Sequence, residues 1–339
     1  MRKLCSIQRI LEVNPIPGAD KIVSYKVLGW NCIAMKDAYR VGDLVVYCEI
    51  DSLLPKDYAS PDGTNPFQFL LDKGVKRIST MKLKGSISMG LLLSLSALPI
   101  GDYKEGDDVT ELLKVEKYEP PIPACLSGQM KGGFPSWIPK TDETRVQVLQ
   151  ETLDKYAGTE CYISIKLDGT SSTHYLKDGV FGVCGRTIDY LETEGNTYWK
   201  VSRQHKIEEA LRADGRNLAI QGEICGEGIQ SNKYKLKGQQ LFAFNIFDID
   251  NQCYFNYVEF MDFCTRYSIP IQTVPILSTS YILENSIDKL IEMSKGDSII
   301  DKGPREGIVI RPLKEIRDPN IGRVSFKAIN PDFLLAYND

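Results

Sequence analysis

The stretch from Cys161 to Thr173, CYISIKLDGTSST, combines a strand-like pattern with residues that could do chemistry. Its apolar run alternates with a period of two, carries Lys166 within it, and breaks at Asp168-Gly169. A lysine in a half-buried strand is costly unless it has a partner. The break therefore presents an amine, a carboxylate and a flexible backbone close together.

Lys166 is a candidate nucleophile. A free lysine amine has a pKa of about 10.4, so it is charged at neutral pH until burial, a nearby cation or a metal ion lowers that value. The neutral amine can attack a carbonyl or a phosphorus atom. Asp168 can hold a ribose hydroxyl or a hydrated metal, and Gly169 lets a phosphate approach the backbone, so the pattern favours phosphorus. Taken alone, the sequence Lys166-Leu167-Asp168-Gly169 is also consistent with an exposed lysine before a turn.

Composition sets the broad class of protein. The 339 residues suffice for two domains, and 42% hydrophobic and 25% charged residues are typical of a soluble globular chain. We see no signal peptide and no membrane-spanning stretch, which predicts an intracellular, cytoplasmic protein without a membrane partner. The nine cysteines include no C-x-x-C pair, which indicates reduced core thiols.

The net charge of −4 argues against a protein that simply coats nucleic acid, but it allows local basic surfaces. Two stretches qualify, residues 76–84 and 233–237, and each could equally be a solvated segment. The candidate nucleic-acid contacts in the first stretch are Lys76, Arg77, Lys82 and Lys84.

The sequence pattern changes near residue 118. Before it, short β runs separated by Gly, Asp and Pro fit a small barrel such as an OB-fold, which predicts a nucleic-acid-binding domain over residues 1–117. Residues 118–140 are rich in Pro and Gly and are the expected linker. Residues 141–339 then form the second predicted domain.

The second domain mixes helices and strands. Thr141 is expected to cap a helix with apolar positions through Tyr156, and Asp178-Gly179 predicts a hairpin turn. Further helices are expected over residues 198–211 and around Ile287. The remaining expected strands cover residues 217–225, 239–250, 306–311 and 323–329.

Six short motifs occur in order between residues 134 and 330. They are Lys166-Leu167-Asp168-Gly169, Gly185-Arg186-Thr187, Gly222-Glu223-Ile224, Phe244-Asn245-Ile246-Phe247-Asp248, Glu306-Gly307-Ile308-Val309-Ile310-Arg311 and Ser325-Phe326-Lys327. Together they resemble the motifs of the covalent nucleotidyltransferase superfamily, which contains ATP-dependent RNA and DNA ligases and mRNA capping enzymes.

The amino-terminal third narrows this resemblance. Residues 9–20, 41–47 and 83–92 are similar to the OB domain that precedes the catalytic domain in RNA ligases that seal nicks with a 3′-OH RNA end. The resemblance implies an α+β fold. In it, an N-terminal OB-fold β-barrel is followed by a nucleotidyltransferase (ATP-grasp-like ligase adenylation) domain of two antiparallel sheets with flanking helices.

The resemblance implies catalytic roles for Lys166, Glu306 and Lys327 in the transfer of AMP from ATP. Lys166 would attack the α-phosphorus of ATP to give lysyl-AMP, while bound ATP, metal and Lys327 suppress its protonation. Glu306 would organise the water shell of Mg²⁺ or Mn²⁺, and Asp168 would help to hold that metal. Lys327 would neutralise the α-phosphate as charge builds there.

Four further residues are implied to bind ATP. Gly169 would admit a phosphate, Arg186 would bind phosphate of ATP or of the nucleic-acid end, and Glu223 would hydrogen-bond the ribose. Phe247 would stack on adenine. Arg186, Glu223 and Phe247 also have plain structural alternatives, which are a surface arginine, a salt bridge at a strand end and a core phenylalanine.

The last motif departs from the family pattern. It commonly reads Lys-x-Lys, but Ser325 stands at the first of these positions here. Either Lys327 acts alone, or Arg323 on the same strand face lends charge.

Three functions fit these residues. The first is an RNA ligase, expected to be a monomer acting on RNA or an RNA-containing nicked duplex in RNA repair. The second is a DNA ligase or capping enzyme, which typically places an OB domain after the last motif, whereas only residues 328–339 follow Lys327 here. The third is a non-catalytic OB-fold nucleic-acid-binding protein, which would not be expected to retain Lys166, Glu223 and Glu306.

Overall fold

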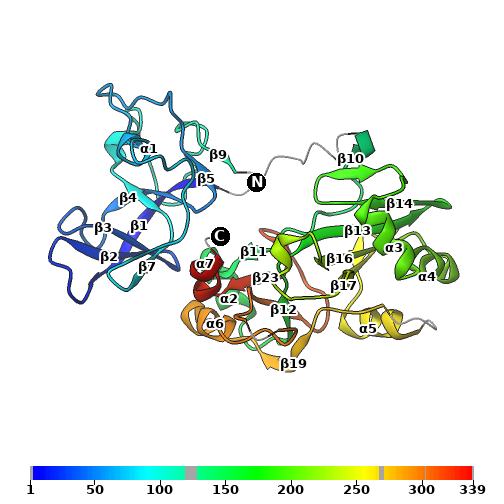
Figure 1. The fold of residues 1–339 in the computed structure, drawn as a ribbon. Coiled ribbons are helices and arrows are strands. Elements are labelled where there is room, and N and C mark those ends of the chain that lie inside the picture. The colour runs from blue at the N-terminus through cyan, green and yellow to red at the C-terminus, as the bar shows by residue number, and fades with distance from the viewer. Residues whose placement is uncertain (1–2, 119–127, 267–270, 302, 338–339) are drawn as a thin grey trace. The chain divides into compact units, whose positions relative to one another are not determined.

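The computed structural model describes residues 3–118, 128–266, 271–301 and 303–337 (Figure 1). Two compact units emerge, one formed by Met1–Pro121 with Pro331–Asp339 and the other by Ile122–Asn330. Residues 119–127 of the predicted linker lie outside the described residues. The segment that follows includes strand β10, which pairs with β15 of the second unit. The boundaries at residues 117 and 140 therefore stay a prediction.

The first unit is built on a strongly bent antiparallel sheet. In spatial order its strands are β3 (Trp30–Met35), β2 (Ile22–Val27), β1 (Cys5–Pro15), β4 (Leu44–Cys48) and β8 (Leu91–Leu93). The backbone N–H of Met89, just before β8, donates to the carbonyl of Asn31 in β3 at 2.8 Å. This bond joins the two ends of the sheet into a nearly closed barrel, which is the arrangement of an OB-fold.

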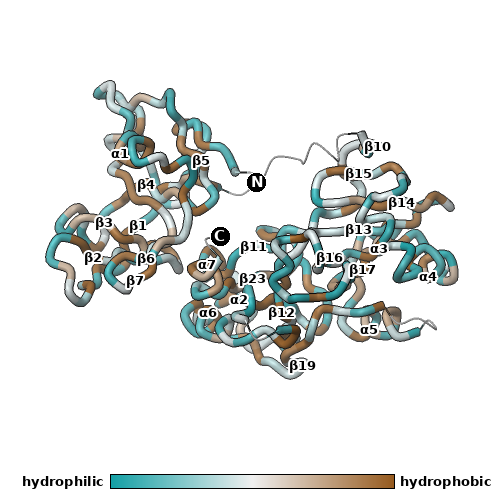
Figure 2. Tube along the Cα trace, viewed as in Figure 1, coloured by the Kyte–Doolittle hydropathy of each residue, from teal (hydrophilic) through white to brown (hydrophobic). Residues whose placement is uncertain are grey.

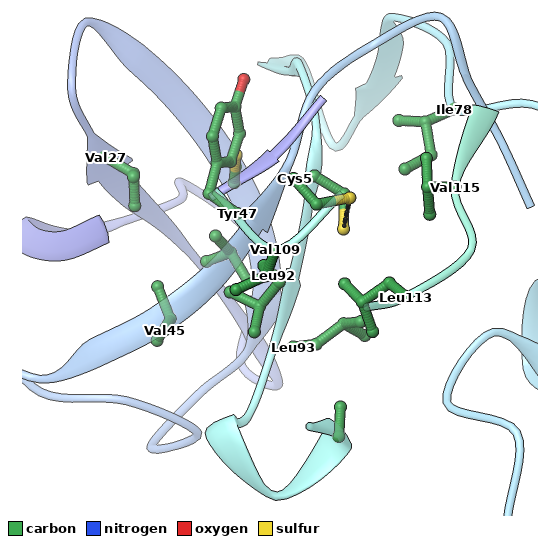
Figure 3. Packing of buried hydrophobic residues seen from close by; sticks show 14 of the residues in the cluster. Cys5, Val27, Val45, Tyr47, Ile78, Leu92, Leu93, Val109, Leu113 and Val115 are labelled. Atoms are coloured by element: carbon green, nitrogen blue, oxygen red, sulfur yellow. Dashed lines mark hydrogen bonds between the residues drawn. The ribbon is translucent and has the colours of Figure 1, made fainter. Parts of the chain in front are cut away.

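The barrel interior is filled by apolar side chains from all of these strands. Figure 3 shows Cys5, Val45 and Tyr47 among the buried side chains that pack in this unit. The thiols of Cys5 and Cys48 face each other across β1 and β4 at 2.8 Å. Smaller elements of this unit are β5 (Ser52–Leu53), α1 (Gln68–Leu71), β6 (Met81–Leu83), β7 (Ser86–Ser88), a 3-10 turn (Leu95–Ala97), β9 (Glu116–Lys117) and α7 (Pro331–Tyr337).

The second unit contains two sheets. The first has the order β10 (Met130–Gly133), β15 (Ile188–Tyr190), β14 (Val180–Cys184), β13 (Thr170–Lys177), β16 (Leu218–Gly226), β17 (Gln239–Asp248) and β18 (Cys253–Tyr254). The second has the order β11 (Thr144–Arg145), β23 (Phe326–Ile329), β20 (Gly307–Pro312), β12 (Glu160–Lys166) and β19 (Ile276–Ile282). All neighbours are antiparallel except β11 and β23, which run parallel. A short pair, β21 (Arg317–Asp318) and β22 (Gly322–Arg323), precedes β23.

Helices cover the outer face of each sheet. The seven-stranded sheet packs against α3 (Thr197–Gln204), α4 (Ile207–Asp214) and α5 (Tyr257–Arg266). The five-stranded sheet packs against α2 (Gln150–Tyr156) and α6 (Ile287–Ser294). Figure 2 shows hydrophobic residues along β12 and β19 and polar residues on the exposed turns of α4. None of the described helices is long and apolar enough to cross a membrane.

Most predicted elements are confirmed, including the α+β class and the hairpin, where Asp178 and Gly179 both have positive φ. Two helix predictions need correction. The helix expected over residues 198–211 is broken by Lys206, whose φ of 50° lies outside the helical region. The helix expected after Thr141 starts as a 3-10 turn at Val146–Val148 and becomes α-helical from Gln150. Thr141 does not cap it, and its hydroxyl instead hydrogen-bonds to Ser171.

Candidate active site

Residues 166–169 connect the two sheets of the second unit. Lys166 ends β12 in the five-stranded sheet, and Thr170 begins β13 in the seven-stranded sheet. The register of β12 and β20 places Lys166 opposite Gly307, so Glu306 lies directly beside the amine. The motifs that hold Lys166 and Glu306, distant in sequence, therefore meet because their strands are neighbours.

Lys166 and Glu306 form an ion pair. The Nζ atom donates to Oε1 of Glu306 at 2.5 Å, and both side chains are largely buried. Burial opposes the charged amine, but the carboxylates of Glu306, Glu223 and Asp168 outweigh it and raise the pKa of Lys166 above its usual value. In the nucleotide-free protein, Lys166 is therefore an ammonium group.

The carboxylates around Lys166 carry more negative charge than a buried site favours. Burial, together with the charges of Glu306 and Asp168, raises the pKa of Glu223 to about 8, against the lowering effect of Lys166. Burial also raises the pKa of Glu306. Glu223 stands on β16 and accepts the backbone N–H of Gly169 at 3.1 Å. The cluster is therefore suited to receive positive charge.

Asp168 is held from three sides by the segment around β16. Its carboxylate pairs with Lys233, its N–H donates to the hydroxyl of Tyr234 at 2.7 Å, and its carbonyl lies against the thiol of Cys225. An added Cβ on Gly169 would collide with the carbonyl of Ile224, so packing alone requires glycine there. The sequence suggested a solvated or nucleic-acid-binding role for residues 233–237 and missed this contact of Lys233.

Lys327 joins the cluster from β23. Burial, together with the positive charges of Lys166 and Arg145, lowers its pKa to about 7. Arg145 stands opposite Lys327 in the parallel pair of β11 and β23. Sequence reasoning missed Arg145, because only the pairing of two strands far apart in the chain brings it there.

Ser325 lies in a buried network of hydrogen bonds and ion pairs. Its hydroxyl accepts from Nε of Arg311 at 2.9 Å, and Arg311 also binds Glu143 at 2.7 Å. Arg323 pairs with Glu315, donates to Asn245 at 2.8 Å and lies over the ring of Tyr254. The described contacts thus give Arg323 a structural role.

Two predicted ATP-binding residues lie apart from the Lys166 cluster. The side chain of Arg186 is 45% exposed and pairs with Asp142 at 3.0 Å, and the charge of Asp142 acts in turn on Lys327. Phe247 is 1% exposed and packs in an edge arrangement against Tyr254.

Phe244 is better placed than Phe247 to meet a ligand. It is an extra residue in β17 at a bulge opposite Gln221 and Gly222. Its half-buried ring packs with the cluster that contains Ile165 and Leu167, next to Lys166. The sequence motif contains both phenylalanines, but a bulge that changes which of them faces the site leaves no signal in a period-two pattern.

The candidate nucleic-acid residues of the first unit differ in exposure. Lys82 and Lys84 are exposed on the hairpin of β6 and β7, and Lys76 is also exposed. Arg77 is half-buried, lies over the ring of Tyr118 and is 3.7 Å from Asp51. Three of the four side chains are therefore accessible.

The residues proposed for the metal fit a water-mediated site. Oε2 of Glu306 is buried and has no hydrogen-bond partner among the described residues. Across the described residues, no three His, Cys, Asp or Glu side chains lie close enough together to bind a metal ion directly. Asp168 and Glu306 therefore suit a hydrated Mg²⁺ or Mn²⁺ bound through its waters.

Comparison with known proteins agrees with this arrangement of sheets and motifs. The family model for RNA ligases matches residues 159–329, and a model of an OB-fold domain matches residues 4–95. A comparison with curated proteins found no match.

Several solved structures of an RNA ligase from Naegleria gruberi match almost the entire chain. The structure with PPi is 38% identical, with all of both chains covered and a TM-score of 0.90. A point mutant with AMP and Mn is 37% identical, with the same coverage and a TM-score of 0.91. A second mutant, with ATP and Mn, is 37% identical over 98% of this chain and 99% of that one, with a TM-score of 0.90.

The chain belongs to the RNA ligase family. The prediction of an RNA ligase with an amino-terminal OB domain is confirmed.

Replacing Arg311 by Met should lower the free energy of unfolding by roughly 3–5 kcal/mol, because it leaves the Glu143 carboxylate buried without its main partner. Urea denaturation measures the loss. The double variant Arg311→Met/Glu143→Leu should recover most of it. Equal losses in the single and double variants would show that the ion pair does not matter.

Proposed function

We propose that this protein is an ATP-dependent RNA ligase that joins 3′-OH and 5′-phosphate ends at nicks, working as a monomer. The observation that carries the proposal is the pairing of Lys166 with Glu306 inside a cluster of Asp168, Glu223 and Lys327. A lysine buried among carboxylates that a metal or nucleotide can engage is suited to covalent chemistry on a phosphate.

The first step is attack by Nζ of Lys166 on the α-phosphorus of ATP. A nitrogen–phosphorus bond forms, the bond from that phosphorus to the pyrophosphate oxygen breaks, and pyrophosphate leaves. The ammonium group gives two of its three protons to solvent, one before the attack and one after it, and the nitrogen keeps the third. Lys327 stabilises the charge on the α-phosphate. Asp168 and Glu306 would hold a hydrated Mg²⁺ or Mn²⁺, which supplies positive charge at the phosphates. Family structures solved with ATP and Mn support this choice of ligands.

Two further steps complete ligation. AMP passes from Lys166 to the 5′-phosphate of the nucleic-acid end, which frees the lysine. The 3′-OH then attacks that activated phosphate, the phosphodiester bond forms, and AMP leaves. Glu223 would hold the ribose of the nucleotide, and Arg186 would bind a phosphate of ATP or of the end.

The alternatives are less well supported. Membership of the RNA ligase family argues against a DNA ligase or capping enzyme. Retention of Lys166, Glu223 and Glu306 within one cluster argues against a non-catalytic OB-fold protein.

Lys166→Met should abolish the covalent adenylate, because methionine keeps much of the side-chain bulk but has no nucleophile. Intact-mass spectrometry after incubation with ATP and Mn²⁺ should show one added AMP on the unmodified protein and none on the variant. A thermal unfolding curve of the variant serves as the control for folding. An adduct of equal yield on the variant would place the nucleophile elsewhere.

Substituting Lys76, Lys82 and Lys84 together by Ala should weaken binding to a nicked RNA duplex, most strongly at low salt. Each lost phosphate contact should reduce the salt slope of the binding constant by about 1. Fluorescence anisotropy across a salt series measures this. Lys36→Ala, an exposed lysine of the same unit, is the matched control, and an unchanged slope in the triple variant would remove this surface from the interface.

A further inference from the structure

Asp168 and Glu306, the two carboxylates expected to hold the metal, are both paired with lysines in the nucleotide-free protein. Glu306 pairs with Lys166, the proposed nucleophile, and Asp168 pairs with Lys233. The second pair is as buried as the first, with both side chains 13% exposed. A buried ion pair of this kind differs from an exposed salt bridge, because both charged groups are largely desolvated and each depends on the other.

The loop that carries Lys233 is built to present it to Asp168. Gln230, Ser231 and Asn232 all have positive φ, which is rare in succession for residues with a side chain. The amide of Asn232 closes the loop by binding both the N–H and the carbonyl of Leu236, at 3.0 and 2.9 Å. This closure fixes the turn that contains Lys233.

The position of the Asp168 backbone does not depend on Lys233. The hydroxyl of Tyr234, next in the chain, holds the N–H of Asp168, and Tyr234 itself is buried. Lys233 therefore adds charge to a carboxylate whose main chain is already held. Its role is electrostatic, and removing its amine leaves the turn anchored.

We propose that Lys233 is a positioning residue that neutralises Asp168 until a divalent cation binds, and that it competes with that cation for the carboxylate. The inference rests on the proposed function, since it concerns the same metal. Metal binding then displaces two ammonium groups from two carboxylates. Lys166 is freed from Glu306 as the nucleophile, and Lys233 is freed from Asp168 without entering the reaction.

The positive charge of Lys233 would weaken metal binding to the nucleotide-free site. Without the Lys233 ammonium, the three carboxylates near Lys166 would attract a divalent cation more strongly even without nucleotide. With it, the empty site is close to charge balance, and the metal binds well only when the phosphates of ATP add negative charge. Lys233 would thus couple metal binding to nucleotide binding.

The test is Mn²⁺ binding to the nucleotide-free protein, followed by the electron paramagnetic resonance signal of free Mn²⁺. Lys233→Met should tighten binding by about fivefold or more, the change expected when a nearby like charge is removed from a partly buried site. Lys233→Arg, which keeps the charge, should bind as the unmodified protein does. Lys237→Met, an exposed lysine of the same loop, is the matched control for net charge.

Unchanged or weaker Mn²⁺ binding by Lys233→Met would overturn the inference. If that variant does not fold, acetylation of Lys233 in the unmodified protein, followed by mass spectrometry, gives the same answer. Reactivity of the amine should rise when Mn²⁺ is added, and constant reactivity would contradict competition. The proposed ligase activity is judged separately: an adenylate that still forms on Lys166 while Mn²⁺ affinity is unchanged rejects only the role of Lys233.

Discussion

The ion pair between Lys166 and Glu306 is the interaction on which the rest of the site depends. It stabilises an ammonium group and a carboxylate that would each be costly to bury alone. The same pairing keeps Lys166 protonated, and a protonated amine has no free electron pair. In the proposed mechanism, binding of nucleotide and metal therefore has to change the charge balance before Lys166 can attack.

The fold makes this pairing by strand register. Three neighbouring strands of one sheet position these residues: Lys166 ends β12, Glu306 directly precedes β20, and Lys327 lies on β23. Glu223 comes from the other sheet, next to the β13 strand that follows Gly169. The short connection at Asp168 brings the two sheets together, so the loop that carries Lys233 and Tyr234 acts on the point where both sheets meet.

The sequence identified the charged residues of the cluster around Lys166, but it missed residues that contact them. Lys166, Glu223, Glu306 and Lys327 stand at strands or strand ends that alternation and turn residues reveal, and the structure brings their charges together. Arg145 and Lys233 were missed because their partners lie far away in the chain. Two local features left no signal in the apolar spacing: the bulge at Phe244 in β17, and the positive φ of Lys206, which divides the expected helix.

The most direct test is the pH dependence of lysine adenylylation in a single turnover, with the protein in excess over ATP and with ATP and Mn²⁺ well below saturation, so that the rate reports the nucleotide-free protein. The raised pKa of Lys166 means that only a small fraction of the amine is neutral at neutral pH, and this fraction grows as pH rises. The rate of adenylate formation should therefore increase steadily from pH about 6 to about 9, the range below the usual lysine pKa. A rate that is flat across this range would contradict the claim that a carboxylate-held ammonium must lose its proton before it reacts.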